Sequence, residues 1–149
     1  MSKITAAITA VGGYVPDYVL SNEILETMVD TNDEWITART GIKERRILKD
    51  KDKGTSFLAI QAAKNLLKKN NTDPKEIDMI VMATATPDMP VAVTGSYVAT
   101  QIGAENAFSY DLMAACSSFL FGMSVAAKYI ESGRYKKVLL IGADKMSSI

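Results

Sequence analysis

The chain has 149 residues, enough for one domain with a hydrophobic core, and its 17 basic side chains balance 17 acidic ones. Scattered basic residues and few aromatic ones argue against a nucleic-acid partner, and no apolar run approaches the roughly 20 residues of a membrane span. With no signal-peptide pattern, one cysteine and no histidine, the sequence predicts a cytoplasmic protein that has neither an internal disulfide nor a Cys/His zinc site.

The first 30 residues predict a strand followed by a short helix. Residues 3–11 alternate between apolar and polar side chains and stop at Gly12-Gly13, which is the pattern of a strand and its breaker. Ser21 is a good N-cap, and apolar residues recur at helical spacing through 24–29. We therefore predict a short amphipathic helix after Ser21.

Residues 31–54 are more polar. A second helix-start signal begins at Thr31, which places Trp35 on a second short helix with acidic residues in its first turn. The segment 42–48 is ambiguous and predicts a strand only weakly, whereas 49–54 is a charged, solvated loop.

The remaining residues predict an α/β fold. Residues 55–69 form the clearest amphipathic helix, and the near-continuous apolar runs at 77–84 and 136–143 are typical of strands buried on both faces of a mostly parallel sheet. Between these two strands we predict a helix at 95–102, a strand at 107–112 and a helix at 118–131, which gives the order β-α-β-α-β.

Cys116 lies at the predicted junction between a strand and a helix. The unpaired N–H groups at a helix start would favour a thiolate, so this cysteine could act as a nucleophile. A lone cysteine beside Ala114-Ala115 is more often a buried filler, however, and the chain has no histidine to serve as its base. From its residue context alone, the filler interpretation is the better supported one.

Trp35 and Arg39 stand four residues apart on one predicted helical face. An exposed pair could hold a planar group, such as a nucleotide base, by stacking and cation–π attraction. The commoner arrangement is a partly buried tryptophan whose ring is covered by the arginine stem, and spacing alone favours that alternative.

Three blocks together resemble β-ketoacyl-acyl carrier protein synthase III: TNDEWITARTGIKERRI at 31–47, TATPDMPV at 84–91 and DLMAACSSF at 111–119. The resemblance implies a thiolase-like fold with layers α-β-α-β-α and a mostly parallel mixed sheet. Members of this family are homodimers roughly twice this long with two similar halves, so residues 1–149 would be one amino-terminal thiolase-like domain and the carboxy-terminal half would be absent.

The resemblance also implies a reaction and its residues. Cys116 would take the acyl group of an acyl-CoA primer, and malonyl-acyl carrier protein would then lose carbon dioxide and attack the acyl-cysteine in a Claisen condensation. The catalytic His and Asn of the family belong to the absent half. CoA enters as a thioester substrate, and no cofactor or metal is expected.

Further roles follow from matching positions. Trp35 and Arg39 would hold the adenine of CoA, Thr31 would be a neighbouring contact, and Val91 would end the acyl pocket and reach across the dimer. Residues 92–95 and Ser117-Ser118 depart from the usual family pattern. Two alternatives are a related condensing enzyme of secondary metabolism and a catalytically incomplete fragment, whose uncovered apolar face would cause self-association.

Overall fold

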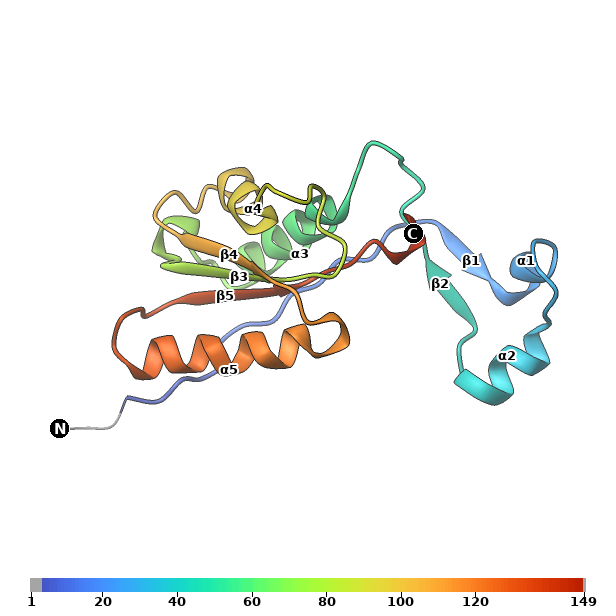
Figure 1. The fold of residues 1–149 in the computed structure, drawn as a ribbon, viewed down its shortest axis with the longest axis horizontal. Helices are drawn as coiled ribbons and strands as arrows, with labels where there is room; N and C mark the ends of the chain where they lie inside the picture. The colour runs from blue at the N-terminus through green and yellow to red at the C-terminus, as the bar shows by residue number, and fades with distance from the viewer. Residues whose placement is uncertain (1–3, 149) are drawn as a thin grey trace. The chain divides into compact units, whose positions relative to one another are not determined.

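The computed structural model describes residues 4–148, which divide into two compact units (Figure 1). Val15–Asp52 forms the smaller unit, and the described residues on either side of this segment form the larger one. Among residues 4–148, no helix combines the length and apolar content needed to cross a membrane. The assignment of 1–149 to one domain stays a prediction.

The larger unit is built on a three-stranded parallel sheet in the order β4-β3-β5. Its strands are β3 (Met79–Ala83), β4 (Phe108–Leu112) and β5 (Val138–Gly142), and Val81 pairs with both Tyr110 and Leu140. Every residue of β3 is buried, because the central strand has a neighbour on each side and helices over both faces.

Three helices cover the two faces of this sheet. Helices α3 (Thr55–Lys69) and α4 (Thr94–Ile102) lie on one face, and α5 (Ser118–Glu131) lies on the other (Figure 1). Alternate residues of β3 serve the two faces, so Met82 lies next to Gly95 of α4, whereas Val81 lies next to Gly122 of α5. Ile80 and Met82 belong to the main apolar cluster with α3 and α4.

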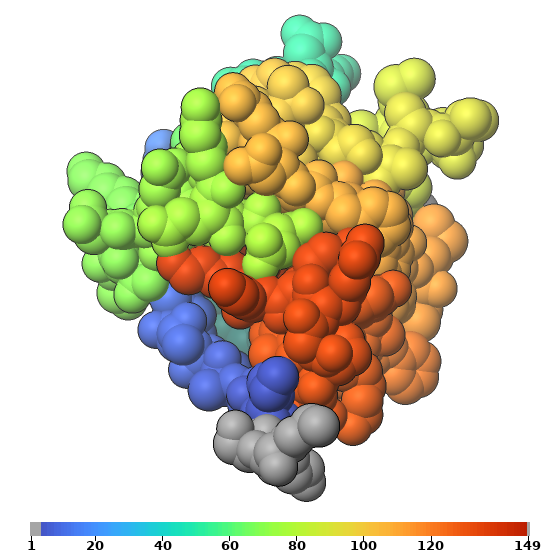
Figure 2. All heavy atoms as spheres, turned by 90° about the vertical axis from the view of Figure 1, so that its left-hand side faces the viewer, coloured from blue at the N-terminus to red at the C-terminus, as the bar shows by residue number. Residues whose placement is uncertain are grey.

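Short 3-10 turns connect these elements, at η1 (Pro74–Glu76), η2 (Ala115–Ser117) and η3 (Met146–Ser148). Figure 2 looks at the amino end of the sheet, where green atoms that follow α3 lie against red-orange atoms that lead into β5. There the Asp78 carboxylate accepts the backbone N–H groups of Lys137 and Lys136 at 2.9 and 2.7 Å. These bonds lower the pKa of Asp78 from its usual value, because they stabilise the ionised carboxylate.

The smaller unit pairs two short strands with two short helices. Strands β1 (Val19–Ser21) and β2 (Glu44–Arg46) are antiparallel, with Leu20 opposite Arg45. Helices α1 (Asn22–Glu26) and α2 (Asp33–Thr40) lie between these strands in the chain. Ile36 is the one buried hydrophobic residue of the smaller unit, which therefore has almost no apolar core.

The predicted helices of the larger unit are confirmed to within one residue, and its three sheet strands are confirmed with ends trimmed by one or two residues. The predicted strand at 3–11 is wrong over the described residues 4–11. An alternating pattern of apolar and polar residues shows that a segment is able to form a strand, but it does not provide the neighbouring strand needed for pairing. In this segment Ile8 is 77% exposed. The glycine after this segment has a packing role, because a Cβ on Gly12 would lie 2.7 Å from the backbone nitrogen of Leu66 on α3.

Two predictions in the smaller unit need adjustment. The helix after Ser21 ends at Glu26, so Met28 and Val29 lie outside it and are exposed. The weakly predicted strand at 42–48 exists but is limited to Glu44–Arg46. In both segments local propensity predicted the correct type of element. The length of the element depends on contacts with the rest of the chain, which the local sequence does not show.

Candidate active site

Cys116 is a free, exposed thiol in the turn that joins β4 to α5. It is the middle residue of η2, two residues before the first residue of α5, and thus lies at the junction of strand and helix that the sequence predicts. The buried-filler alternative is wrong, because the residue is exposed. A nucleophile at this position can be reached from solvent.

The backbone around Cys116 has an unusual conformation. Ala115 has φ +46°, a left-handed value that costs a residue with a Cβ about 1–2 kcal/mol relative to glycine. The buried hydroxyl of Ser118 accepts the N–H of Ala114 at 2.6 Å, and the N–H of Ser117 donates to the carbonyl of Ala114 at 3.1 Å. These two bonds close the turn on both sides of Cys116 and hold it in its strained shape.

We expect Ser118→Ala to lower the free energy of unfolding by about 1–3 kcal/mol, because the Ala114 N–H loses its acceptor. Ser117→Ala is the matched control, since Ser117 is exposed and its side chain makes no capping bond; its effect should stay within about 0.5 kcal/mol. Urea unfolding followed by far-UV circular dichroism measures both variants. Equal effects at the two positions would contradict a bond that spans the cysteine.

A carboxylate one residue before the end of β4 fixes the start of α4. The two oxygens of Asp111 accept the N–H groups of Thr94 and Gly95 at 2.7 and 2.8 Å. Negative charge here also suits the positive end of the helix dipole. Because Val91 lies three residues before α4, Asp111 limits how far the segment that carries Val91 can move, and Val91 itself is 94% exposed.

A second carboxylate, Asp144, holds the segment that follows β3. One of its oxygens accepts the hydroxyl of Thr84 at 3.0 Å and the N–H groups of Ala85 and Thr86 at 2.7 and 3.1 Å. Parallel strands end at the same edge of a sheet, so the segments after β3, β4 and β5 meet there. Two of the three sequence blocks, 84–91 and 111–119, therefore converge at the edge that carries Cys116.

The third sequence block lies in the smaller unit. Trp35 and Arg39 both belong to α2, and the guanidinium carbon of Arg39 stands 4.4 Å from the centroid of the Trp35 ring. Trp35 is 51% exposed, so the arginine covers part of the ring and leaves part open to solvent. Thr31 precedes α2 and is partly exposed; Cys116 belongs to the other unit.

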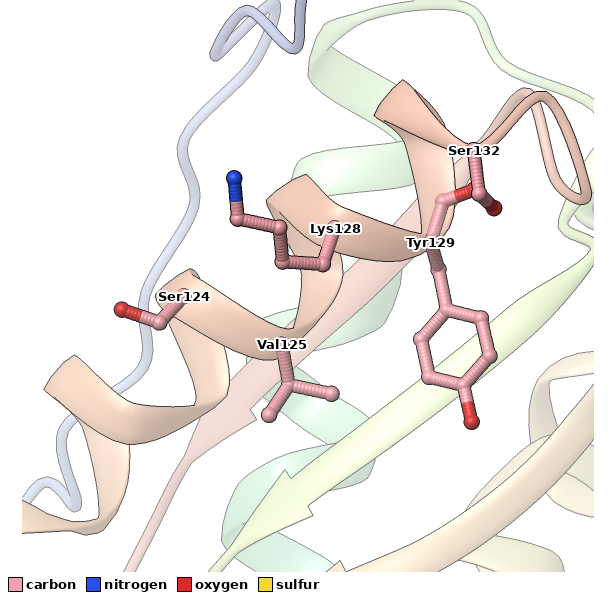
Figure 3. Close-up of a pocket in the computed structure, with 5 residues that line it drawn as sticks. All are labelled: Ser124, Val125, Lys128, Tyr129 and Ser132. Carbon is pink, nitrogen blue, oxygen red and sulfur yellow. The ribbon is translucent and has the colours of Figure 1, made fainter.

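A shallow groove of about 410 Å³ runs along the carboxy-terminal half of α5 (Figure 3). Its lining comes from this helix and the residue after it: Ser124, Val125, Lys128, Tyr129 and Ser132. None of these side chains belongs to the predicted site.

Asp111 and Asp144 were not singled out by the sequence. Each stands within two residues of the carboxyl end of a strand of the parallel sheet, and that position was the available signal. Asp111 accepts two backbone N–H groups, and Asp144 accepts two backbone N–H groups together with the hydroxyls of Thr84 and Thr86. Backbone donors leave no trace in the residue pattern. Among the described residues, neither carboxylate forms a hydrogen bond with Cys116; both hold the segments around it.

The chain is similar to known proteins along its whole length. A family model described as 3-Oxoacyl-[acyl-carrier-protein (ACP)] synthase III matches residues 110–149. Beta-ketoacyl-[acyl-carrier-protein] synthase III 2 of Bacteroides thetaiotaomicron is 54% identical over all 149 residues, which span 44% of that protein. The synthase III of Porphyromonas gingivalis is 53% identical over 148 residues, 99% of this chain and 44% of the relative. The chain thus spans less than half the length of these relatives.

Solved structures give the same result. The 3-oxoacyl-[acyl-carrier-protein] synthase III of Aquifex aeolicus superposes with a TM-score of 0.89 at 45% identity, over 93% of this chain and 44% of the other. The priming β-ketosynthase of the R1128 polyketide pathway superposes with a TM-score of 0.89 at 35% identity, over 94% of this chain and 42% of the other. The predicted α/β, thiolase-like fold class is confirmed.

Proposed function

Since the chain corresponds along its whole length to the amino-terminal part of β-ketoacyl-acyl carrier protein synthase III, we propose that the complete protein starts fatty acid synthesis as an acyltransferase. The observation that carries this proposal is the exposed Cys116 in a strained turn at the carboxyl edge of the sheet. A nucleophile must be both accessible and held in place, and this turn provides both properties.

In the proposed first step, the Cys116 sulfur attacks the carbonyl carbon of an acyl-CoA thioester. The tetrahedral intermediate collapses, the bond to the CoA sulfur breaks, and CoA leaves as a thiol while the acyl group stays on Cys116. The N–H of Cys116 itself is a donor for the developing oxyanion, and removal of one such donor costs other enzymes about 3–4 kcal/mol. No cofactor is needed, because CoA takes part as substrate.

In the proposed second step, malonyl-acyl carrier protein releases carbon dioxide and its carbanion attacks acyl-Cys116. The new carbon–carbon bond forms as the bond to sulfur breaks, so the product is a β-ketoacyl-acyl carrier protein and Cys116 leaves as a thiolate. A proton from solvent then restores the thiol. A catalytic His and Asn assist this step in the family. The 149-residue chain has no His, so the rest of the protein must supply that group.

We assign the adenine of CoA to the open part of the Trp35 ring, beside Arg39 and with Thr31 as a neighbouring contact. An aromatic face with a guanidinium at 4.4 Å presents both a stacking surface and positive charge for the adjoining phosphates. We also assign the complete protein to the cytoplasm as a homodimer. The exposed Phe108 on β4, an edge strand of the described sheet, supports a partner at that edge.

Val91 is assigned to the far end of the primer pocket, where its size would limit the primer. We expect Val91→Phe to reduce adducts from branched or longer acyl-CoA primers at least tenfold relative to acetyl-CoA, since the larger ring fills the space. Competition between acetyl-CoA and isobutyryl-CoA, read by intact mass, measures the ratio. Val91→Ala is the control and should leave the branched adduct in place; an unchanged ratio in Val91→Phe would remove Val91 from the pocket.

A condensing enzyme of secondary metabolism is the second candidate, and the 35% identity to the polyketide priming synthase supports it. Identity of 54% to a synthase III favours the first candidate. Both candidates use the same cysteine and differ in the acceptor, so comparison of malonyl-acyl carrier protein with other acceptors separates them in the complete protein.

The direct test is intact mass after incubation of the purified chain with acetyl-CoA. We expect an added acetyl group on the wild-type chain and none on Cys116→Ala. An adduct on both chains would place the reaction elsewhere. A folded wild-type chain with no adduct would show that this part of the protein does not carry out the first step on its own.

A further inference from the structure

Helix α2 carries the Trp35–Arg39 pair but has almost no apolar side with which to dock. Its sequence is DEWITART, and Ile36 is its only buried residue. Hydrophobic packing normally fixes how a short amphipathic helix sits, and an eight-residue helix is marginal on its own. Polar contacts must therefore determine how α2 presents Trp35.

Those contacts converge on Asn22, which is 1% exposed. Its Nδ2 donates to Oδ1 of Asp33 at 2.6 Å and to the carbonyl of Ile42 at 2.8 Å, while its Oδ1 accepts from Nη1 of Arg45 at 2.6 Å. The N–H of Asn22 also donates to the carbonyl of Lys43 at 3.2 Å. One amide thus ties the first turn of α2 to the segment that follows it and to β2.

Asp33 continues this network along α2. Its Oδ1 also accepts the hydroxyl of Thr37 at 3.1 Å, its Oδ2 lies 3.6 Å from Nζ of Lys43, and its N–H donates to the Glu26 carboxylate. The hydrogen bonds from Asn22 and then Thr37 lower the pKa of Asp33, so the carboxylate stays ionised. An ionised acceptor gives Asn22 a stronger partner than a neutral one would.

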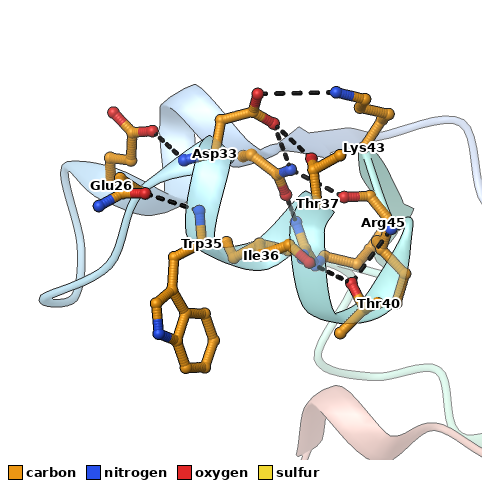
Figure 4. A network of polar contacts seen from close by, with 11 residues as sticks. Glu26, Asp33, Trp35, Ile36, Thr37, Thr40, Lys43 and Arg45 are labelled. Carbon is orange, nitrogen blue, oxygen red and sulfur yellow. Dashed lines mark hydrogen bonds and ion pairs between the residues drawn. The ribbon is translucent and has the colours of Figure 1, made fainter.

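The anchoring residues and the Trp35–Arg39 pair lie on nearly opposite sides of the helix. At about 100° per residue, Asp33 is about 200° from Trp35 and Thr37 is about 200° from both Trp35 and Arg39, whereas Asp33 and Arg39 are about 120° apart. Figure 4 shows the Trp35 ring directed away from the network. The anchors fix α2 from one side and leave the ring open on the other.

We propose that Asn22 is a positioning residue for the Trp35–Arg39 pair, and through it for the adenine of CoA; the ligand in this inference rests on the proposed function. The pair itself is local to α2, so it persists when Asn22 is replaced. Replacement of Asn22 changes the position in which α2 holds the pair, because Asp33, Arg45 and the Ile42 carbonyl all lose a buried partner.

Trp35 is the only tryptophan in the chain, so its fluorescence reports directly on this site. The probe is adenosine 3′,5′-bisphosphate, which has the adenine end of CoA and no thiol to react with Cys116. We expect Asn22→Ala to weaken its binding at least tenfold in a fluorescence titration. Glu23→Gln, an exposed neighbour on α1, is the matched control and should bind as the wild type does.

An exchange of side chains separates positioning from mere filling of space. Asn22→Asp puts two carboxylates in contact and should weaken binding as much as Asn22→Ala does. Asn22→Asp combined with Asp33→Asn restores an amide donor against a carboxylate and keeps an acceptor for Arg45, at the cost of the bond to the Ile42 carbonyl. We expect the double variant to bind within about threefold of the wild type, whereas a role in packing alone predicts no rescue.

Each outcome decides one of the two ideas. If the wild type binds and Asn22→Ala binds equally well, or if the double variant fails to recover, the positioning role is overturned. If the wild-type chain does not bind, the adenine assignment fails, and the positioning role is judged on the free protein. In that case Asn22→Ala should still lower the anisotropy of Trp35 and raise its quenching by acrylamide; unchanged values would overturn it.

Discussion

Asp111→Ala is expected to lower the free energy of unfolding by about 3 kcal/mol, because two N–H groups at the start of α4 lose a charged acceptor at once. Charge-assisted bonds are about twice as strong as neutral ones, and the favourable charge near the helix dipole goes with them. Water replaces the carboxylate poorly here, since Thr94 is only 3% exposed. Urea unfolding followed by far-UV circular dichroism measures the change.

Two variants sharpen this test. Asp111→Asn keeps the shape but turns one oxygen into an amide that faces an N–H donor, so it should also destabilise, though less than alanine does. Asp52→Ala changes an exposed residue of the charged loop and should alter the free energy by less than about 0.5 kcal/mol. If Asp111→Ala and Asp52→Ala behave alike, the carboxylate does not anchor α4.

Ile80→Ala should be more damaging still, with an expected loss of about 4 kcal/mol in the free energy of unfolding. Ile80 lies in the central strand, is fully buried, and belongs to the cluster beneath α3 and α4. A cavity there cannot close easily, because the strand is held by neighbours on both sides. Circular dichroism is the appropriate probe, since Trp35 fluorescence reports on the smaller unit alone.

The chain contains its own control for this substitution. Ile8→Ala removes the same atoms from a residue that is 77% exposed and lies in no strand, so it should cost less than about 0.5 kcal/mol. A loss of 2 kcal/mol or more at Ile8 would instead support the strand that the alternating sequence predicts. The pair of variants therefore tests both the core and the amino-terminal segment.

Sequence reasoning succeeded where one periodic pattern decides the structure. The continuous apolar run around Ile80 could only be a doubly buried strand or a buried helix segment, and its length selected the strand. Cys116 could be placed at a junction between strand and helix, although its exposure and the left-handed Ala115 before it could not be foreseen. Backbone strain has no sequence signal when the residue is not glycine.

The smaller unit shows where such reasoning ends. A buried asparagine at the centre of a polar network looks, in the sequence, like any helix-start residue. Asn22, Asp33 and Arg45 are separated by more than ten residues each, so only the folded chain shows that they share hydrogen bonds. The spacing of apolar residues reveals which face of an element is buried. A unit with one buried hydrophobic residue has almost no such pattern.

The chain has one tryptophan and one cysteine, and the two fall in different units. An energy-transfer acceptor coupled to the exposed Cys116 thiol would receive energy from Trp35 when excitation is at the red edge of the tryptophan band, where the six tyrosines absorb little. No engineered donor is needed, and no second cysteine competes for the label. The efficiency of that transfer would give the separation between the two units in solution. The same pair would also report whether an added carboxy-terminal half brings the thiol and the indole into a single fixed arrangement.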